Sequence, residues 1–303
     1  MNCTQTRRMP AVLLAIMLGW PSLSFAETLD FKVSFRGMLT AYQELGIGDV
    51  YLEVEQTGVS LDGEPVTRTR LAASSQAYPV VEQFYPYRYE FTSYHQDARS
   101  RSLAFERRKE TSRLRHDLLL LDWEGEEVRR FGIDRPEQAP QPPSLSPPAL
   151  IGTLHSAGLP DYGARLTPYT ESLATPPPTT IDRLALLQQI RALPMIPEAS
   201  RDLTVTDGKE FIHYQVTVAR RESIQTDAGP RGAWKVRVEG FEMDRGEERL
   251  RHRPVYIWLG DDERRLPLRF VSRNALGTFT VEMQHREIQS AANSATSDEV
   301  MHR

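Results

Sequence analysis

The amino-acid sequence predicts a mainly antiparallel β protein, folded as a curved sheet, a sandwich or a partly open barrel, with one amphipathic helix. Apolar and polar residues alternate with period two through most of the chain, and one apolar stripe with helical spacing lies among these runs. Strands with one apolar and one polar face are typical of antiparallel sheets, whereas buried parallel strands are apolar throughout. A proline-rich segment separates the two β regions that we expect.

Residues 1–26 are predicted to be a secretory signal peptide. Arg7 and Arg8 provide the positive charge, residues 11–20 form an apolar core too short to cross a bilayer, and a small-x-small cleavage site ends at Ala26. We expect the mature chain to begin directly after it and to contain no transmembrane span. The expected location is the periplasm of a bacterium with two membranes.

The N-terminal β region is predicted over residues 27–133. Apolar side chains alternate with polar ones from Leu29 to Phe35, which indicates a half-buried strand. A glycine turn at 46–48 then leads to a second alternating strand in the manner of a hairpin. Further alternating runs lie at 66–71, 87–91, 103–105, 114–120 and 128–133.

Residues 134–180 are predicted to be a linker or a long surface loop. Six prolines between residues 134 and 148 remove backbone donors and hold the chain extended, and further prolines up to residue 178 keep the segment irregular. The polar tail at 289–303 is expected to be disordered because it has too few apolar side chains to pack.

A helix and an antiparallel meander are predicted over residues 181–288. An apolar stripe runs from Ile181 to Ile190, and Pro194 ends the helix. Thr180 or Asp182 is the expected N-terminal cap. Strands are expected at 212–218, 234–238, 255–259, 266–270 and 279–283, the first of them after an Asp-Gly hairpin turn.

Composition excludes several kinds of chemistry. The only cysteine, Cys3, would be removed with the signal peptide, so the mature chain would have no disulfide, thiolate nucleophile or cysteine metal ligand. The formal net charge is −4 and becomes −6 without Arg7 and Arg8. Nucleic-acid binding is therefore not expected, because phosphate attraction needs a basic surface.

No catalytic, cofactor or metal site is predicted, and the expectation is a protein that is not an enzyme. The sequence has no G-x-S-x-G elbow, and neighbours such as His116 and Asp117 would point to opposite faces of a strand. None of the seven histidines has H-x-H or H-E-x-x-H spacing. The acidic trio at 261–263 lies where a hairpin turn is needed and lacks the alternating ligands of a calcium loop.

Two basic clusters and one aromatic stretch provide candidate ligand contacts. The clusters span residues 107–116 and 249–253, and alternate arginines on a strand can hold a phosphate or an anionic lipid headgroup. Aromatic residues between 78 and 94 can line a ligand cavity. The alternative is a charged outer face that keeps the sheet soluble, with the rings in the core. The candidate contacts are Arg113, Arg115, Tyr85, Tyr87, Tyr89 and Trp258.

Four segments of the second half of the chain form a recognisable series. They are Asp182-Arg183-Leu184 through Arg191-Ala192-Leu193, Asp207-Gly208-Lys209, Val255 to Pro267, and Gly277-Thr278-Phe279. Together they resemble an exported bacterial family known as domain of unknown function 3108, and W-L-x-D-D followed by R-L-P is the most specific motif. The segment at 85–89, Phe105-Glu106 and the first strand are similar to it as well. The resemblance implies an exported protein and no catalytic residues, and this chain departs from simpler members in its proline-rich insert.

Three hypotheses of function follow from the sequence. The first is a non-enzymatic periplasmic protein that binds a lipid, a lipidated polymer or another amphiphilic envelope component in the concavity of a curved sheet. The alternative is an envelope structural or adaptor protein that binds a protein partner through an edge strand or the proline-rich segment. The third is a hydrolase of envelope material, which would need a carboxylate pair or a histidine in a cleft.

Overall fold

The computed structural model describes residues 26–133, 149–169, 175–244, 247–251 and 253–284. Sixteen strands form one sheet that does not close, so the prediction of a mainly antiparallel β protein is confirmed. The strand order is β8-β7-β6-β5-β4-β3-β2-β1-β16-β15-β14-β12-β11-β10-β9, and β13 pairs with β12 beside this path. The N-terminal and C-terminal strands join where β1 pairs with β16.

The elements have the following bounds. The strands are β1 (Ala26–Gly37), β2 (Glu44–Leu61), β3 (Glu64–Ser74), β4 (Arg88–Gln96), β5 (Arg101–Glu110), β6 (Leu114–Asp122), β7 (Glu127–Ile133), β8 (Leu166–Pro168), β9 (Thr180–Ile181), β10 (Ser200–Thr206), β11 (Phe211–Thr226), β12 (Gly229–Asp244), β13 (Glu247–Leu250), β14 (Val255–Gly260), β15 (Pro267–Arg273) and β16 (Gly277–Met283). The helices are α1 (Pro79–Phe84), α2 (Ala149–Ser156) and α3 (Arg183–Arg191), with 3-10 turns η1 (Met38–Thr40) and η3 (Gly163–Arg165). The predicted signal peptide, apart from Ala26, and the predicted tail at 289–303 lie outside the described residues.

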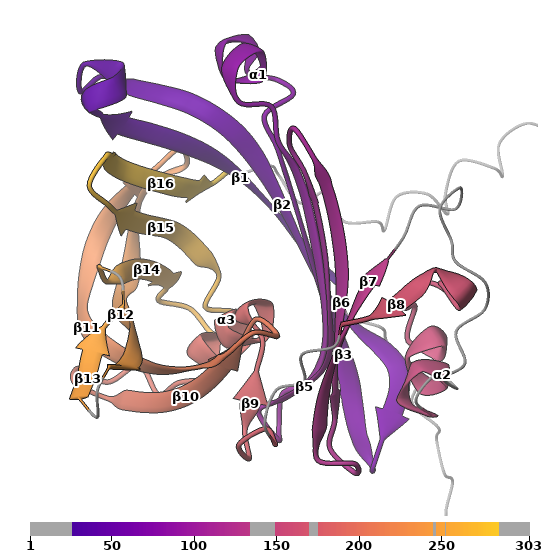
Figure 1. The fold of residues 1–303 in the computed structure, drawn as a ribbon. Helices are drawn as coiled ribbons and strands as arrows, with labels where there is room; N and C mark the ends of the chain where they lie inside the picture. The colour runs from indigo at the N-terminus through magenta and orange to yellow at the C-terminus, as the bar shows by residue number, and fades with distance from the viewer. Residues whose placement is uncertain (1–25, 134–148, 170–174, 245–246, 252, 285–303) are drawn as a thin grey trace, which may run out of the picture.

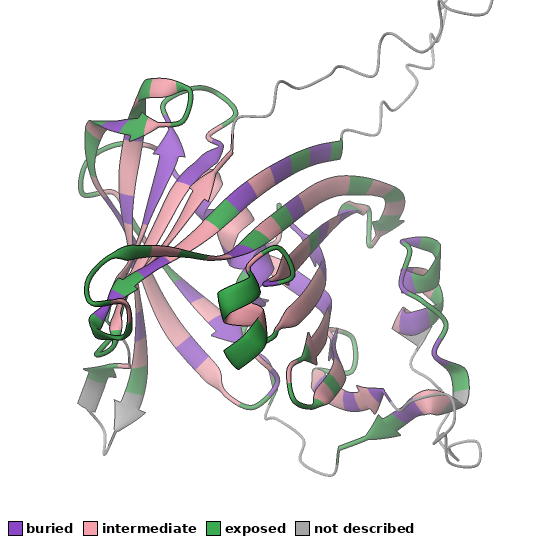
Figure 2. Cartoon of the chain, turned by 90° about the horizontal axis from the view of Figure 1, so that it is seen from above, coloured by how far each residue is buried: buried purple, intermediate pink, exposed green. Residues whose placement is uncertain are grey.

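Strands β1–β7 form a curved wall, and the sheet curls through β16 so that β10–β14 lie opposite this wall (Figure 1). Helix α3 lies between the wall and these strands, and α2 lies on the other side of the wall (Figure 1). We call the face of the sheet that is directed towards α3 the inner face. Exposure varies from residue to residue along the strands, as expected for a sheet with differently covered faces (Figure 2).

Helix α3 is the helix that the sequence predicts. Its N-terminal cap is Asp182, whose carboxylate accepts hydrogen bonds from the backbone N–H groups of Leu184 and Ala185. The buried residues Ala185, Leu186 and Ile190 pack against the valines of β11 and β12. On the wall side Leu184 belongs to a cluster with Phe105 and Leu119, so α3 is apolar towards both layers.

Helix α2 lies within the segment for which the sequence predicts a linker or long loop. Residues 134–148 and 170–174 of that segment lie outside the described part, but residues 149–156 are helical and 166–168 form β8. Ile151 and Leu154 of α2 pack with Tyr94 and Leu118 in one buried cluster on the outer side of the wall. Tertiary packing therefore supports a helix that is too short to form alone.

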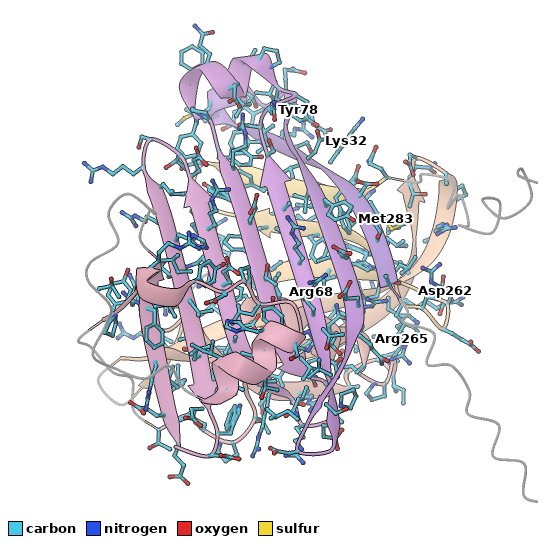
Figure 3. All side chains as sticks on the ribbon, turned by 90° about the vertical axis from the view of Figure 1, so that its right-hand side faces the viewer. Lys32, Arg68, Tyr78, Asp262, Arg265 and Met283 are labelled. Carbon is cyan, nitrogen blue, oxygen red and sulfur yellow. The ribbon has the colours of Figure 1, made fainter. Side chains whose placement is uncertain are left out.

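The turns of the wall fall at two ends. Strand β1 finishes at Gly37 beside the start of β16, so η1 and the β15–β16 turn share one end, which we call the η1 end. Helix α1, between β3 and β4, and the β5–β6 turn fall at the same end because these strands alternate in direction. In Figure 3, Tyr78 marks this end, while Arg265 lies towards the other.

Candidate functional site: an aromatic row beside a cationic cleft

Four aromatic rings form a row on the inner face of the wall. Tyr87, which directly precedes β4, Tyr89 and Phe91 of β4, and Phe105 of β5 stack in sequence, with centroid distances of 5.1, 6.1 and 6.1 Å. The period-two alternation of β4 sends the first three rings to the same face. Phe105 is buried under α3, whereas the other three rings are partly exposed. We call these four residues the aromatic row.

Neighbouring strands leave room for the rings. The Tyr87 hydroxyl donates to the carbonyl of Ile47 at 3.1 Å, and the ring lies over Gly48, where a Cβ atom would overlap the hydroxyl. Ala73 and then Val50 follow Tyr89 across β3 and β2, and both are partly exposed. The inner face therefore offers an apolar surface beside the row that α3 covers only in part.

A cleft of about 530 Å³ adjoins the row. Its walls come from β5, β6 and β7 and from the hairpin turn between β10 and β11. Its charged lining comprises Arg107, Lys109, Arg115, Arg130 and Lys209 together with Asp117 and Asp207. The five cations exceed the two carboxylates, so the cleft favours an anion.

Lys109 joins the aromatic row to the cleft. Its ammonium lies 6.0 Å from the centroid of Tyr89 and 5.5 Å from that of Phe91. In the β5–β6 register it stands opposite Arg115. Burial lowers the pKa of Lys109, and the nearby charges of Arg107 and Arg183 lower it further. An anion bound beside Lys109 would restore the favourable environment for its charge.

Some charges of the cleft are compensated and others are not. Arg107 forms an ion pair with Asp117 at 2.9 Å, and the Tyr169 hydroxyl donates to the same carboxylate at 2.7 Å. Burial alone would raise the pKa of Asp117, but these two hydrogen bonds and the charges of Arg107 and Arg130 together outweigh it and the pKa is lowered. Within the part of the chain that the structure describes, Lys109, Arg115 and Lys209 form no ion pair, and the buried Nε of Arg130 has no acceptor.

The β10–β11 turn is held against the wall by a glycine. Gly208 has a φ of +86°, a left-handed conformation that other residues adopt with strain. A Cβ atom there would lie 2.9 Å from Leu119 and 3.1 Å from Arg130. The Asp-Gly turn predicted from the sequence thus also brings Lys209 to the cleft.

The structure brings together part of the predicted contact set. Tyr87 and Tyr89 belong to the aromatic row, and Arg115 lines the cleft next to them. Tyr85, at the end of α1, is 61% exposed. Burial raises the pKa of Tyr89 to about 12, and the side chain of Tyr85 contributes to the same shift. Arg113 lies exposed in the β5–β6 turn, outside the cleft lining.

Trp258 of β14 lies apart from this site. It alternates with Ile257 and Leu259, which pack in the α3 cluster, so its ring is directed to the other face of the strand. The ring is 8% exposed, and its Nε1 donates to Glu222 at 2.6 Å. Lys109 lies in the basic cluster predicted at 107–116 but was not among the candidate contacts. Arg130, Tyr169 and Lys209 were not proposed as contacts, because only strand pairing and the curl of the sheet gather them.

Three polar side chains on the wall are arranged like a hydroxyl, histidine and carboxylate triad, but the hydroxyl is buried from solvent. The Thr69 hydroxyl lies 3.1 Å from Nε2 of His95, whose Nδ1 lies 3.1 Å from a carboxylate oxygen of Asp97. Thr69 is fully buried and His95 is 1% exposed, so no substrate reaches the hydroxyl. Asp97 also accepts from Thr67, and its carbonyl accepts from Gln189 of α3. This network ties α3 to the wall.

Two further findings bear on chemistry. Among the described residues, no three His, Cys, Asp or Glu side chains are grouped so that they could hold a metal ion. Of the helices in the described ranges, none is long and apolar enough to cross a membrane.

Fold and site together define an open, curved antiparallel β protein whose inner face carries an aromatic row that ends at a cationic cleft. Residues 163–284 match the family described as "Protein of unknown function (DUF3108)", which confirms the resemblance for this part of the chain. None of the curated proteins matches the chain.

Solved structures with a similar course of the chain share little sequence. A β-barrel-like protein of the domain of unknown function DUF1849 from Brucella abortus has a TM-score of 0.47 at 9% identity, covering 85% of this chain and 94% of its own. A candidate exported protein with a YmcC-like fold from Bacteroides fragilis has a TM-score of 0.29 at 10% identity, covering 85% and 95%. A candidate lipoprotein from Parabacteroides distasonis has a TM-score of 0.30 at 10% identity, covering 88% and 97%. At these scores the likenesses carry no conclusion about function.

Proposed function

We propose that this protein is a non-enzymatic periplasmic binder of an anionic amphiphile, such as a lipid of the cell envelope. The observation that carries the proposal is the junction at Lys109, where a partly exposed aromatic row meets a cleft with five cations. The periplasmic location rests on the predicted signal peptide.

Each part of the site suits one part of such a ligand. Rings that are partly exposed lose their remaining contact with water when an acyl chain covers them, and each covered methylene contributes about 0.8 kcal/mol. A phosphate or carboxylate in the cleft would accept hydrogen bonds from Lys109, Arg115 and Lys209, which have no carboxylate partner within the described residues. A wholly apolar ligand would leave these cations unused.

The edges of the sheet weigh against the adaptor hypothesis. The terminal strands β8 and β9 have three and two residues, and short edge strands discourage pairing with another chain, although β9 covers only Thr204 and Val205 of the longer β10. The sealed Thr69–His95–Asp97 group likewise offers no nucleophile for the hydrolase hypothesis.

Lys109→Ala tests the proposal, with Lys235→Ala as the matched control. Both lysines are partly buried over two aromatic rings, since Lys235 lies 4.5 Å from Tyr256 and 5.0 Å from Trp258. We expect Lys109→Ala to weaken binding of dansyl-labelled undecanoic acid about tenfold, as loss of a charge-assisted hydrogen bond would. Binding of the uncharged methyl ester should change little.

The same titrations carry a pH signature. Burial and neighbouring cations lower the pKa of Lys109. Affinity for the acid should therefore begin to fall at a lower pH than it would with a lysine of ordinary pKa. The proposal fails if the two lysine variants lose affinity equally, or if the acid and its ester respond alike. It fails as well if the protein purified from its native envelope contains no lipid by mass spectrometry and binds neither probe.

A further inference from the structure

We propose that the η1 end of the protein docks onto the surface of a bilayer that contains anionic lipids. This inference rests on the proposed function, because a bilayer is the natural source of an amphiphilic ligand. Its basis is a group of exposed apolar side chains on three separate turns at this end, which we call the apolar rim. They are Met38, Leu39, Tyr42, Val80, Phe84, Tyr85 and Leu276.

The rim residues are strongly exposed for their type. Leu39 of η1 is 74% exposed, Phe84 of α1 is 78% exposed, and Leu276 of the β15–β16 turn is 50% exposed. Seven of the eleven large apolar side chains that are exposed in the described part of the chain belong to the rim. So much apolar surface on one end of a molecule marks an interaction site rather than scattered exposure.

One backbone hydrogen bond and one side-chain contact hold the three turns of the rim close to the ends of β1 and β2. The N–H of Met38 donates to the carbonyl of Leu276 at 3.3 Å, which joins η1 to the β15–β16 turn. The ring of Tyr78, directly before α1, packs on Gly46 of β2. Figure 1 shows η1 and α1 at the same end of the wall.

The opposite end of the wall is polar, which makes the molecule two-sided along its strands. The β2–β3 turn contains Asp62 and Gly63, the β4–β5 turn runs from Asp97 to Ser100, and the β6–β7 turn contains Glu124 and Glu126. The apolar turns are thus confined to one end, and a flat partner would meet all three of them at once.

Charge indicates which partner this is. Arg36, Arg113, Arg115 and Arg273 lie exposed at the η1 end and form no ion pair with another described residue. Of the acids at this end, Glu82 pairs with Arg88 and Glu110 with Arg108, which leaves Glu44 as an exposed carboxylate against these four arginines. Apolar side chains surrounded by unpaired cations suit the acyl boundary and headgroups of an anionic bilayer.

The rim is continuous with the proposed ligand site. Tyr85 belongs to the rim and lies two residues before Tyr87, whose ring begins the stack with Tyr89 and Phe91. Tyrosine is favoured at the boundary between lipid and water, where its ring is in apolar surroundings and its hydroxyl is wet. An amphiphile leaving the bilayer beside Tyr85 would therefore meet the aromatic row next.

Vesicle partitioning of the double variant Leu39→Ser/Phe84→Ser tests the inference. The control is Ile196→Ser, because Ile196 is 62% exposed and lies before β10, away from the rim. With vesicles of phosphatidylglycerol and phosphatidylcholine in equal parts, we expect the double variant to partition at least about tenfold less than the unchanged protein. Ile196→Ser should partition normally, and added salt should weaken binding.

The two proposals are separated by a crossed measurement. The double variant should keep its affinity for the dansyl-labelled acid in solution, which also shows that it is folded, whereas Lys109→Ala should lose that affinity and still partition onto vesicles. Equal partitioning of the double variant and the unchanged protein would overturn the docking proposal alone. So would an equal loss in Ile196→Ser, or a rim-dependent dimer in sedimentation with no vesicle binding.

Discussion

Asp182 is the point at which α3 is fixed to the wall, and its replacement by alanine should destabilise the fold. The carboxylate is fully buried. It accepts from the Ser93 hydroxyl at 2.6 Å, from the Ser102 hydroxyl at 2.5 Å and from two backbone N–H groups at the start of α3. Ser102 also accepts from the backbone N–H of Asp182 at 2.7 Å. One side chain therefore connects β4, β5 and α3.

The size of the effect follows from these contacts. Loss of the helix cap costs about 1 kcal/mol. The Ser93 hydroxyl would keep no acceptor in a buried place, which costs about 1–3 kcal/mol, while Ser102 keeps one partner. Removing a buried charge recovers part of its desolvation penalty. We expect the free energy of unfolding to fall by about 3 kcal/mol in Asp182→Ala and by about 1 kcal/mol in Asp182→Asn, which keeps the shape.

Urea unfolding followed by circular dichroism measures this difference. Asp262→Ala is the control, since Asp262 also accepts a backbone N–H, that of Arg265 at 2.9 Å, but is exposed. Asp262→Ala should lower the free energy of unfolding by less than about 1 kcal/mol. If Asp182→Ala and Asp262→Ala lose the same free energy of unfolding, Asp182 does not anchor α3 and the reasoning from burial is wrong.

Two further predictions concern the site. Gly48→Ala places a Cβ atom against the Tyr87 hydroxyl, so it should lower the free energy of unfolding by about 1–3 kcal/mol and weaken binding of the dansyl-labelled acid. Its control is Gly152→Ala in α2, which has open space around it and should raise the free energy of unfolding by about 0.5–1 kcal/mol. The pKa of Asp117 is lowered, so its stabilising contribution is present at neutral pH and is lost as pH falls through the lowered pKa. The melting temperature of Asp117→Asn should therefore fall less on acidification than that of the unchanged protein, and equal slopes would contradict this.

The strands of this protein could be predicted from local pattern, but their order could not. Alternation of apolar and polar residues identifies β1 and β16 separately; burial alternates along most of β1, whereas every residue of β16 is half-buried. Nothing in either segment indicates that Phe31 pairs with Met283, since that contact is chosen by the curl of the whole sheet. Helix α2 was missed for a related reason: Ile151 and Leu154 become buried only when the wall is complete.

The candidate site shows the same limit at the level of single residues. Tyr87, Tyr89 and Arg115 could be found because aromatic and basic residues are dense on neighbouring strands of one region. Lys209 could not, because it reaches the cleft only through a turn whose glycine fits against Leu119. A hairpin turn is sufficient to account for an Asp-Gly pair in a sequence, so the pair does not indicate that Gly208 also packs against the wall. Lys209 therefore shows why a residue that reaches a site from the opposite side of a curled sheet is not found from local sequence, whereas Arg130 was missed although it lies on the wall itself.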